Sequence, residues 1–360
     1  MAAWWRAAEA FPDVLKILLR MVAETPNPVH AAKVEWGALC KQRGWEKMAG
    51  TTALQLFNPA QGKGTNSPKA EWRSPGNLKG FWLLEWLKAV GFYQGAITRI
   101  VANPKEPRNA KDRKSYVLIP KRLDWGTHVR VMRRFQEATA ISTTAVKLDI
   151  LTTLGYTETL LRHYDEARTE DLEAEIFGRR ASDVVSGTQM AFYKNLGQST
   201  AVMNIATLSL PRWVAPRSRE DLARLQGALA EHGIIVRSLD ETRGKAYSLL
   251  RYYRDFLSAN DLQPFFEFTN AYSGFIMSQM EKRQYVRPFT TTTLEVLFMN
   301  SDDSQQTFSQ IVRNEGFRNV AYAIRHSTVV PQSRRGRTGK ASVDVRYGLG
   351  QQLIRKAAYP

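Results

Sequence analysis

The chain has 360 residues, with 51 Lys or Arg against 34 Asp or Glu, which gives a formal net charge of +17. A hydrophobic content of 43% excludes a disordered chain, and the single cysteine, Cys40, excludes an internal disulfide framework. No apolar run reaches the roughly 18 residues that span a bilayer, and the first residues lack the order of a signal peptide. We therefore expect a cytoplasmic protein with no membrane contact and an anionic partner, of which nucleic acid is the commonest.

The positive charge is concentrated in two stretches. Residues 58–134 carry 16 Lys or Arg and 5 Asp or Glu, a net charge of +11. Residues 318–360 carry 9 Lys or Arg and one Asp, a net charge of +8. Residues 149–187 between them are acidic, with 9 Asp or Glu and 4 Arg, a net charge of −5. A solvated surface explains any single cation, but two clusters of this size favour contact with nucleic acid.

The first 240 residues are predicted to mix helices and strands. Apolar residues at helical spacing predict helices over 11–22, 30–43, 78–90, 144–168, 168–185 and around 221–229. Runs of β-branched and aromatic residues predict strands over 96–101, 115–120, 128–132, 201–210 and 234–239.

The remaining residues are predicted to be entirely helical. The helices are expected over 240–260, 262–280, 292–299, 307–313, 317–325 and 347–358. The fold class is therefore α+β: a mixed helix and strand domain over 1–240, which carries the nucleic-acid contacts, followed by an all-helical bundle over 241–360.

A long polar segment over residues 57–79 is rich in Gly, Pro, Asn and Ser. Loops of this length are either functional or disordered. Glycines let backbone N–H groups approach a phosphate, Lys and Arg neutralise its charge, Asn or Gln can read base edges, and Trp can stack on a base. The candidate contacts are Gln61, Lys63, Asn66, Lys69, Trp72 and Arg73. The alternative is a surface loop whose Trp packs onto the domain.

Two further basic segments add candidate contacts. The connection over 102–114 supplies Lys111 and Arg113. The loop over 331–340 resembles a multidentate phosphate clamp, although a nuclear-localisation signal would look similar. Its cations, with one that follows, are Arg334, Arg335, Arg337, Lys340 and Arg346.

Motifs for catalysis are missing from the sequence. The segment Gln61-Gly-Lys-Gly-Thr65 departs from the phosphate-binding-loop pattern at both ends. The five histidines show no metal-ligand spacing, and one cysteine cannot build a zinc cluster. We therefore expect a binding protein without a metal or cofactor and not an enzyme.

Several short motifs resemble a known family. They are GKGTN at 62–66, GNLK at 76–79, FWLLEWLK at 81–88, DRKSYVL at 112–118, FRNVAYAIRHST at 317–328 and VRYGLGQ at 345–351. Together they resemble the large subunit of type I CRISPR surveillance complexes, nearest the I-A and I-B large subunits.

The resemblance implies a non-enzymatic subunit of a Cascade ribonucleoprotein in antiviral defence. Such a subunit sits at the crRNA 5′ end, recognises the protospacer-adjacent motif (PAM) in double-stranded DNA and stabilises the R-loop. It contacts crRNA and the backbone, crRNA 5′-end and small subunits, and it recruits a helicase-nuclease or, in a CRISPR-associated transposon, transposition proteins. Its C-terminal bundle resembles the small subunit.

The family pattern assigns roles by position. It places Lys63, Asn66 and Lys69 at the PAM-proximal duplex, and the cations of the 331–340 loop at strand stabilisation. The alternative function is a stand-alone DNA- or RNA-binding accessory protein of replication or recombination, which shares the charge but needs no ribonucleoprotein assembly.

Overall fold

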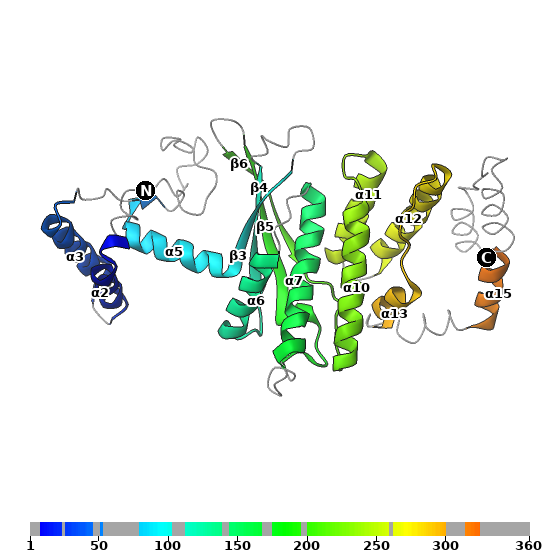
Figure 1. Ribbon diagram of the computed structural model, residues 1–360, viewed down its shortest axis with the longest axis horizontal. Helices are drawn as coiled ribbons and strands as arrows, with labels where there is room; N and C mark the ends of the chain where they lie inside the picture. Colours follow the sequence, from blue (N-terminus) through cyan, green and yellow to red (C-terminus); the bar gives the residue numbers. More distant parts are fainter. Residues whose placement is uncertain are drawn as a thin grey trace. The chain divides into compact units, whose positions relative to one another are not determined.

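The computed structural model describes residues 8–23, 26–45, 51–52, 79–102, 112–138, 144–167, 175–195, 200–258, 262–299 and 314–324 (Figure 1). It confirms the α+β fold class, because the strands of a four-stranded sheet all precede residue 210 and the described elements after it are helices. The chain forms two compact units, Met1–Ala96 with Phe192–Asn204, and Ile97–Ala191 with Ile205–Pro360.

Among its described residues, the first unit has three helices and a two-stranded ribbon, together with the far ends of two strands of the main sheet. Helix α2 has the bounds that apolar spacing predicted, and α3 ends where Gly44 takes a left-handed φ of +65° that other residues rarely adopt. The helix expected over 78–90 begins later and runs further, since residues 79–80 pair with 51–52 as an antiparallel ribbon. The elements are α2 (Phe11–Val22), α3 (Pro28–Gln42), β1 (Thr51–Thr52), β2 (Lys79–Gly80) and α5 (Trp82–Gly95).

Tryptophans dominate the core of the first unit. The rings of Trp36 and Trp82 meet edge to face with centroids 4.8 Å apart, and Trp45 lies 6.1 Å from Trp36. The single cysteine, Cys40, is buried in the same cluster. Its other members come from α2, α3 and the start of α5: Val14, Ile17, Met21, Ala32, Leu39, Phe81 and Leu83.

The four-stranded sheet has the order β3-β4-β5-β6. Its strands are β3 (Ala96–Ile100), β4 (Arg113–Pro120), β5 (Val185–Asn195) and β6 (Thr200–Ser209). Each junction is antiparallel, as shown by backbone bonds from Val101 N to Asp112 O (2.8 Å), from Lys121 N to Val184 O (2.9 Å) and from Leu210 N to Ser186 O (3.3 Å). The strands predicted over 96–101, 115–120 and 201–210 correspond to β3, β4 and β6.

Helices of the second unit pack beside this sheet and beside one another. Helix α7 contacts α6, α10 and α11, α10 also contacts α13, and α11 pairs with α12. Figure 1 shows α7 between the sheet and α10. The described helices are α6 (Trp125–Ala138), α7 (Ala145–Ala167), α9 (Ala181–Val184), α10 (Arg219–Ser238), α11 (Gly244–Ser258), α12 (Gln263–Glu281), α13 (Thr291–Met299) and α15 (Glu315–Ile324).

Two predicted strands are helical. The segment 128–132 lies inside α6, whose first turn is capped by Asp124 Oδ1 accepting from Thr127 N at 3.0 Å. The segment 234–239 is the end of α10, where Ile235 and Val236 are buried. Both predictions rested on β-branched residues, and tertiary burial on a helix face outweighed that preference.

The helix predicted over 168–185 is interrupted in its described part, because residues 175–176 and 181–184 are helical but residues 177–180 between them are not. Within it, α9 spans only Ala181–Val184, and the chain then enters β5, which the sequence did not predict. At Gly187 (φ +150°) a Cβ would clash with the backbone of Leu208, so this strand packs closely against β6. The helices predicted over 307–313 and 347–358 lie outside the described residues.

Candidate nucleic-acid interface

Only one of the thirteen predicted nucleic-acid contacts lies in the part of the chain that the structure describes. Arg113 is the first residue of β4, and it is exposed. The other twelve stay predictions outside the described residues: Gln61, Lys63, Asn66, Lys69, Trp72, Arg73, Lys111, Arg334, Arg335, Arg337, Lys340 and Arg346.

Helix α6 presents a basic face that belongs to the same basic stretch of sequence. Arg130, Arg133 and Arg134 are exposed and share one side of the helix, because residues three and four apart lie above one another. The opposite side packs inward through Val131, Met132 and Phe135, among others. We define the α6 face as these three arginines with two exposed cations that follow β4, Lys121 and Arg122.

Carboxylates neutralise the α6 face only in part. Arg134 Nη1 lies 2.5 Å from Glu166 Oε2, and both side chains are about half exposed, so this pair contributes little to stability. Arg122 and Arg133 have no ion pair with any residue that the structure describes. Burial lowers the pKa of His163 on α7, and the nearby charges of Arg130 and Arg134 lower it further. The surface is therefore electropositive.

An exposed aromatic ring begins the same helix. Trp125, the first residue of α6, is 67% exposed, and its ring centroid lies 5.5 Å from that of His128. Exposed aromatic rings beside cations are typical of surfaces that bind single-stranded nucleic acid. Sequence reasoning counted the charge of this segment but missed the surface, since it assigned residues 128–132 to a strand.

A neighbouring lysine of the same basic stretch is unavailable to nucleic acid. Lys114 Nζ lies 2.7 and 2.8 Å from the two oxygens of Asp149 and 2.8 Å from Ala145 O, and both charged side chains are buried. Tyr116 OH donates to Asp149 Oδ1 at 2.7 Å. Burial lowers the pKa of Lys114 and raises that of Asp149, and the attraction between the two charges opposes both shifts. This cluster joins β4 to α7.

The fully buried histidine His232 is likewise part of the core. Its Nδ1 lies 2.6 Å from Tyr253 OH, and its ring stacks on Trp213 with centroids 5.3 Å apart. Burial lowers the pKa of His232 to about 3, so the imidazole is neutral at physiological pH. Its contacts to surrounding aromatic rings give it a packing role.

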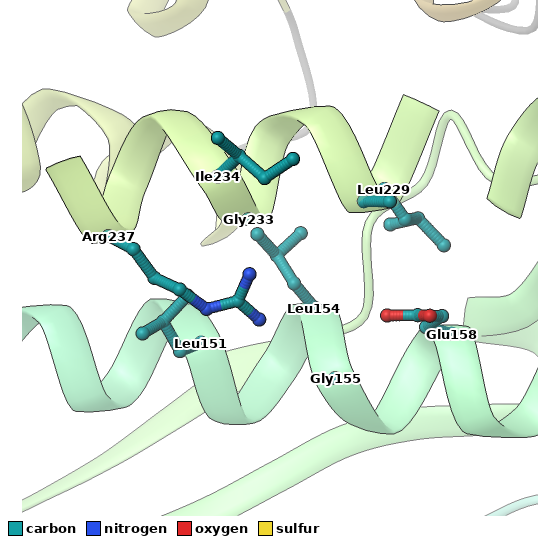
Figure 2. A pocket seen from close by; sticks show the side chains of 9 residues that line it. Leu151, Leu154, Gly155, Glu158, Leu229, Gly233, Ile234 and Arg237 are labelled. Carbon is teal, nitrogen blue, oxygen red and sulfur yellow. The ribbon is translucent and has the colours of Figure 1, made fainter. Parts of the chain in front are cut away.

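A pocket of about 190 Å³ opens between α7 and α10. Figure 2 shows the guanidinium of Arg237 at one end, the carboxylate of Glu158 at the other, and Leu154 between them. Its remaining lining is apolar or small: Leu151, Gly155, Leu229, Ala230, Gly233 and Ile234. A single cation and a single carboxylate around an apolar floor suit binding of a small group with polar edges.

The described residues lack two kinds of feature. They contain no group of three or more His, Cys, Asp or Glu that could hold a metal ion. None of their helices has the length and apolar character needed to cross a membrane. Comparison with known proteins finds no matching family model and no matching curated protein.

Proposed function

We propose that the chain is the large subunit of a type I CRISPR RNA-guided DNA surveillance complex. In this role it is not an enzyme: it binds crRNA and partner subunits, recognises the PAM in duplex DNA and stabilises the R-loop. The observation that carries the proposal is the excess of 17 positive charges, gathered in two stretches of net +11 and +8. The motif resemblance turns this general nucleic-acid preference into a specific assembly.

The α6 face supports the nucleic-acid part of the proposal. It belongs to the +11 stretch and is exposed, and Arg122 and Arg133 have no ion pair among the described residues. The exposed ring of Trp125 begins the same helix. Contacts of this kind bind the phosphate backbone and stack on unpaired bases without reading sequence. That is the demand on a subunit whose target sequence is selected by guide pairing.

The two predicted loops divide the remaining work. Lys63, Asn66 and Lys69 contact the PAM-proximal duplex, where the amide of Asn66 reads a base edge and the lysines hold phosphates. The cations of the 331–340 loop hold the displaced or guide-paired strand. Neither role requires catalysis.

Co-purification tests the proposal. The tagged full chain is expressed with its neighbouring genes and a guide array, and the purified material is examined for RNA and protein. We expect a ribonucleoprotein that contains guide RNA and backbone subunits and that binds motif-bearing duplex more tightly than motif-lacking duplex.

A chain that purifies without RNA or partner subunits contradicts the proposal. If that isolated chain still binds DNA or RNA with a steep salt dependence, the stand-alone accessory protein becomes the better function. Metal-dependent cleavage of DNA by the isolated chain would contradict both.

A further inference from the structure

The pocket between α7 and α10 has an apolar floor. Leu151, Leu154 and Leu229 form that floor and are buried. Gly155 and Gly233 line the pocket without side chains of their own, and a Cβ on them would contact Phe135 at 3.6 Å and Arg237 at 3.4 Å respectively. A slot of about 190 Å³ with apolar walls suits a planar ring more than an extended chain.

The two ends of the pocket carry opposite hydrogen-bonding character. Arg237 bends over Gly233, with Nη1 3.4 Å from the place where a Cβ on that glycine would lie, and its guanidinium points into the gap (Figure 2). Glu158 faces it from α7, about one helical turn beyond Leu154. The end at Arg237 therefore donates hydrogen bonds, and the end at Glu158 accepts them.

Both groups retain free capacity within the described part of the chain. The guanidinium of Arg237 has no ion pair or hydrogen bond to any described residue. Glu158 Oε1 accepts from Arg162 at 2.8 Å in an exposed ion pair that contributes little to stability, and Oε2 has no partner among the described residues. A ligand can therefore engage both ends without breaking a buried interaction.

We propose that this pocket binds an unpaired guanine base. Guanine has two acceptors, O6 and N7, which suit an arginine, and it has N–H donors on its Watson–Crick edge, which suit a carboxylate. Adenine has an amino donor where guanine has O6, so it opposes the guanidinium with a donor. The apolar floor contacts the face of the ring.

Cations at the rim suit the sugar and phosphate that accompany a base. Arg162 lies beside Glu158, and Lys147 Nζ donates to the carbonyl of Arg237 at 3.3 Å. The guanine can belong to a strand or to a free guanosine nucleotide. A guanine that belongs to a strand rests on the proposed function, in which the protein contacts single-stranded nucleic acid.

Binding of defined nucleotides to the full chain tests the pocket. The probes are GMP, AMP and oligouridylate RNA nonamers with one central guanine or adenine, measured by calorimetry and fluorescence anisotropy. We expect the guanine RNA to bind about tenfold more tightly than the adenine RNA, the discrimination of one good bidentate contact. Saturable GMP binding with no gain from the RNA indicates a free nucleotide, and a gain from the RNA indicates a base in a strand.

Filling the pocket from its exposed side removes the site with little risk to the fold. Ala230 is exposed on α10 and lines the pocket, so Ala230→Trp is expected to weaken guanine binding at least about tenfold. Ala223→Trp is the matched control, because Ala223 is exposed two turns earlier on the same helix and does not line the pocket. Circular dichroism and thermal melting check that both variants fold.

Two polar substitutions assign the ends. Glu158→Gln is expected to remove the preference for guanine over adenine, and Arg237→Ala to weaken guanine binding, while Arg224→Ala elsewhere on α10 changes neither. Equal binding of the guanine and adenine RNAs, no effect of Ala230→Trp, or no binding of any nucleotide overturns the proposal. The last result, combined with loss of a partner subunit on Ala230→Trp, would assign the pocket to a protein side chain. Co-purification of guide RNA tests the proposed function separately, since it does not depend on a base preference.

Discussion

Two regions of the second unit bury polar side chains in opposite ways. Between β4 and α7, Lys114 and Asp149 are buried together as a charged pair, with Tyr116 as a further donor. Between α10 and α11, His232 is buried without charge, and Tyr253 OH is its hydrogen-bond partner at Nδ1. The stability of the first region therefore depends on both charged partners being present, whereas the stability of the second depends on the pH.

The difference follows from what compensates the loss of water. Burial raises the pKa of Asp149 and lowers that of Lys114, and the attraction between the two opposite charges opposes both shifts. At His232 burial is the only cause of the shift, and it lowers the pKa to about 3. A charged pair tolerates burial through mutual attraction, and an isolated imidazole tolerates it by remaining neutral.

Breaking the charged pair is expected to produce the largest loss of stability. Asp149→Ala leaves the Lys114 ammonium buried without its counter-charge and removes the acceptor of Tyr116, so we expect a loss of about 3–5 kcal/mol in urea unfolding. Glu166→Ala is the matched control, because it breaks an exposed ion pair of the same helix with Arg134. That control is expected to lose no more than about 1 kcal/mol.

An apolar replacement of the whole cluster separates the penalty of breaking it from its net contribution. The triple variant Lys114→Met, Tyr116→Phe and Asp149→Leu removes these three groups together and leaves Arg254, the other cation near Asp149, partly exposed to solvent. We expect most of the lost stability to return. A triple variant as unstable as Asp149→Ala would mean that the pair contributes more by attraction than its burial costs.

Acid is expected to act most directly on the other region. The folded-state pKa of His232, about 3, lies below the unfolded value of 6.5, so the unfolded chain takes up this proton first as the pH falls. Its contribution is fully present above pH 6.5 and is lost progressively towards pH 3, by about 3 kcal/mol at pH 4.

Urea midpoints between pH 7 and pH 4 measure this contribution. His232→Phe removes the titrating group and is expected to flatten the pH dependence, although the Tyr253 hydroxyl loses a partner at every pH. The exposed His30 supplies the control His30→Gln, which should retain the wild-type slope. Parallel curves for wild type and His232→Phe would assign the acid sensitivity to carboxylates elsewhere.

Local pattern predicted the elements, but burial corrected several of them. The bounds of α2 follow from its own residues, so apolar spacing predicted them. The same spacing did not predict which part of the wide apolar side of α2 is buried by the rest of the protein. Val14, Ile17 and Met21 pack inward, whereas the adjoining arc is exposed and consists of Phe11, Leu15, Leu19 and Val22. Which arc of a helix is buried depends on the other elements that pack against it, and the sequence pattern of the helix alone does not specify them.

The candidate sites show the same division between local and tertiary information. Net charge indicated a basic surface, but it also counted Lys114, which is buried against Asp149. Arg237 and Glu158 are far apart in the sequence and line one pocket because α7 and α10 lie side by side. No spacing rule predicts such a pair.

A buried carboxylate also lies in the region around His232. Neutralising it is expected to change the free energy of unfolding least of all these substitutions. The side chain of Glu231, next to His232, is mostly buried and accepts from Thr290 N at 2.6 Å and from Thr290 Oγ1 at 2.9 Å. These donors are uncharged and immediately precede α13, where a negative charge is favourable.

The expected loss is small because the substitution Glu231→Gln keeps one acceptor. We expect about 1 kcal/mol in urea unfolding, with no change for Glu295→Gln at an exposed position of α13. A loss as large as that of Asp149→Ala would contradict the distinction, because it would mean that uncharged donors make a buried carboxylate as indispensable as a buried lysine does. A small loss would confirm that the sensitivity of the β4 and α7 region comes from leaving a charge unpaired, and not from burying a carboxylate.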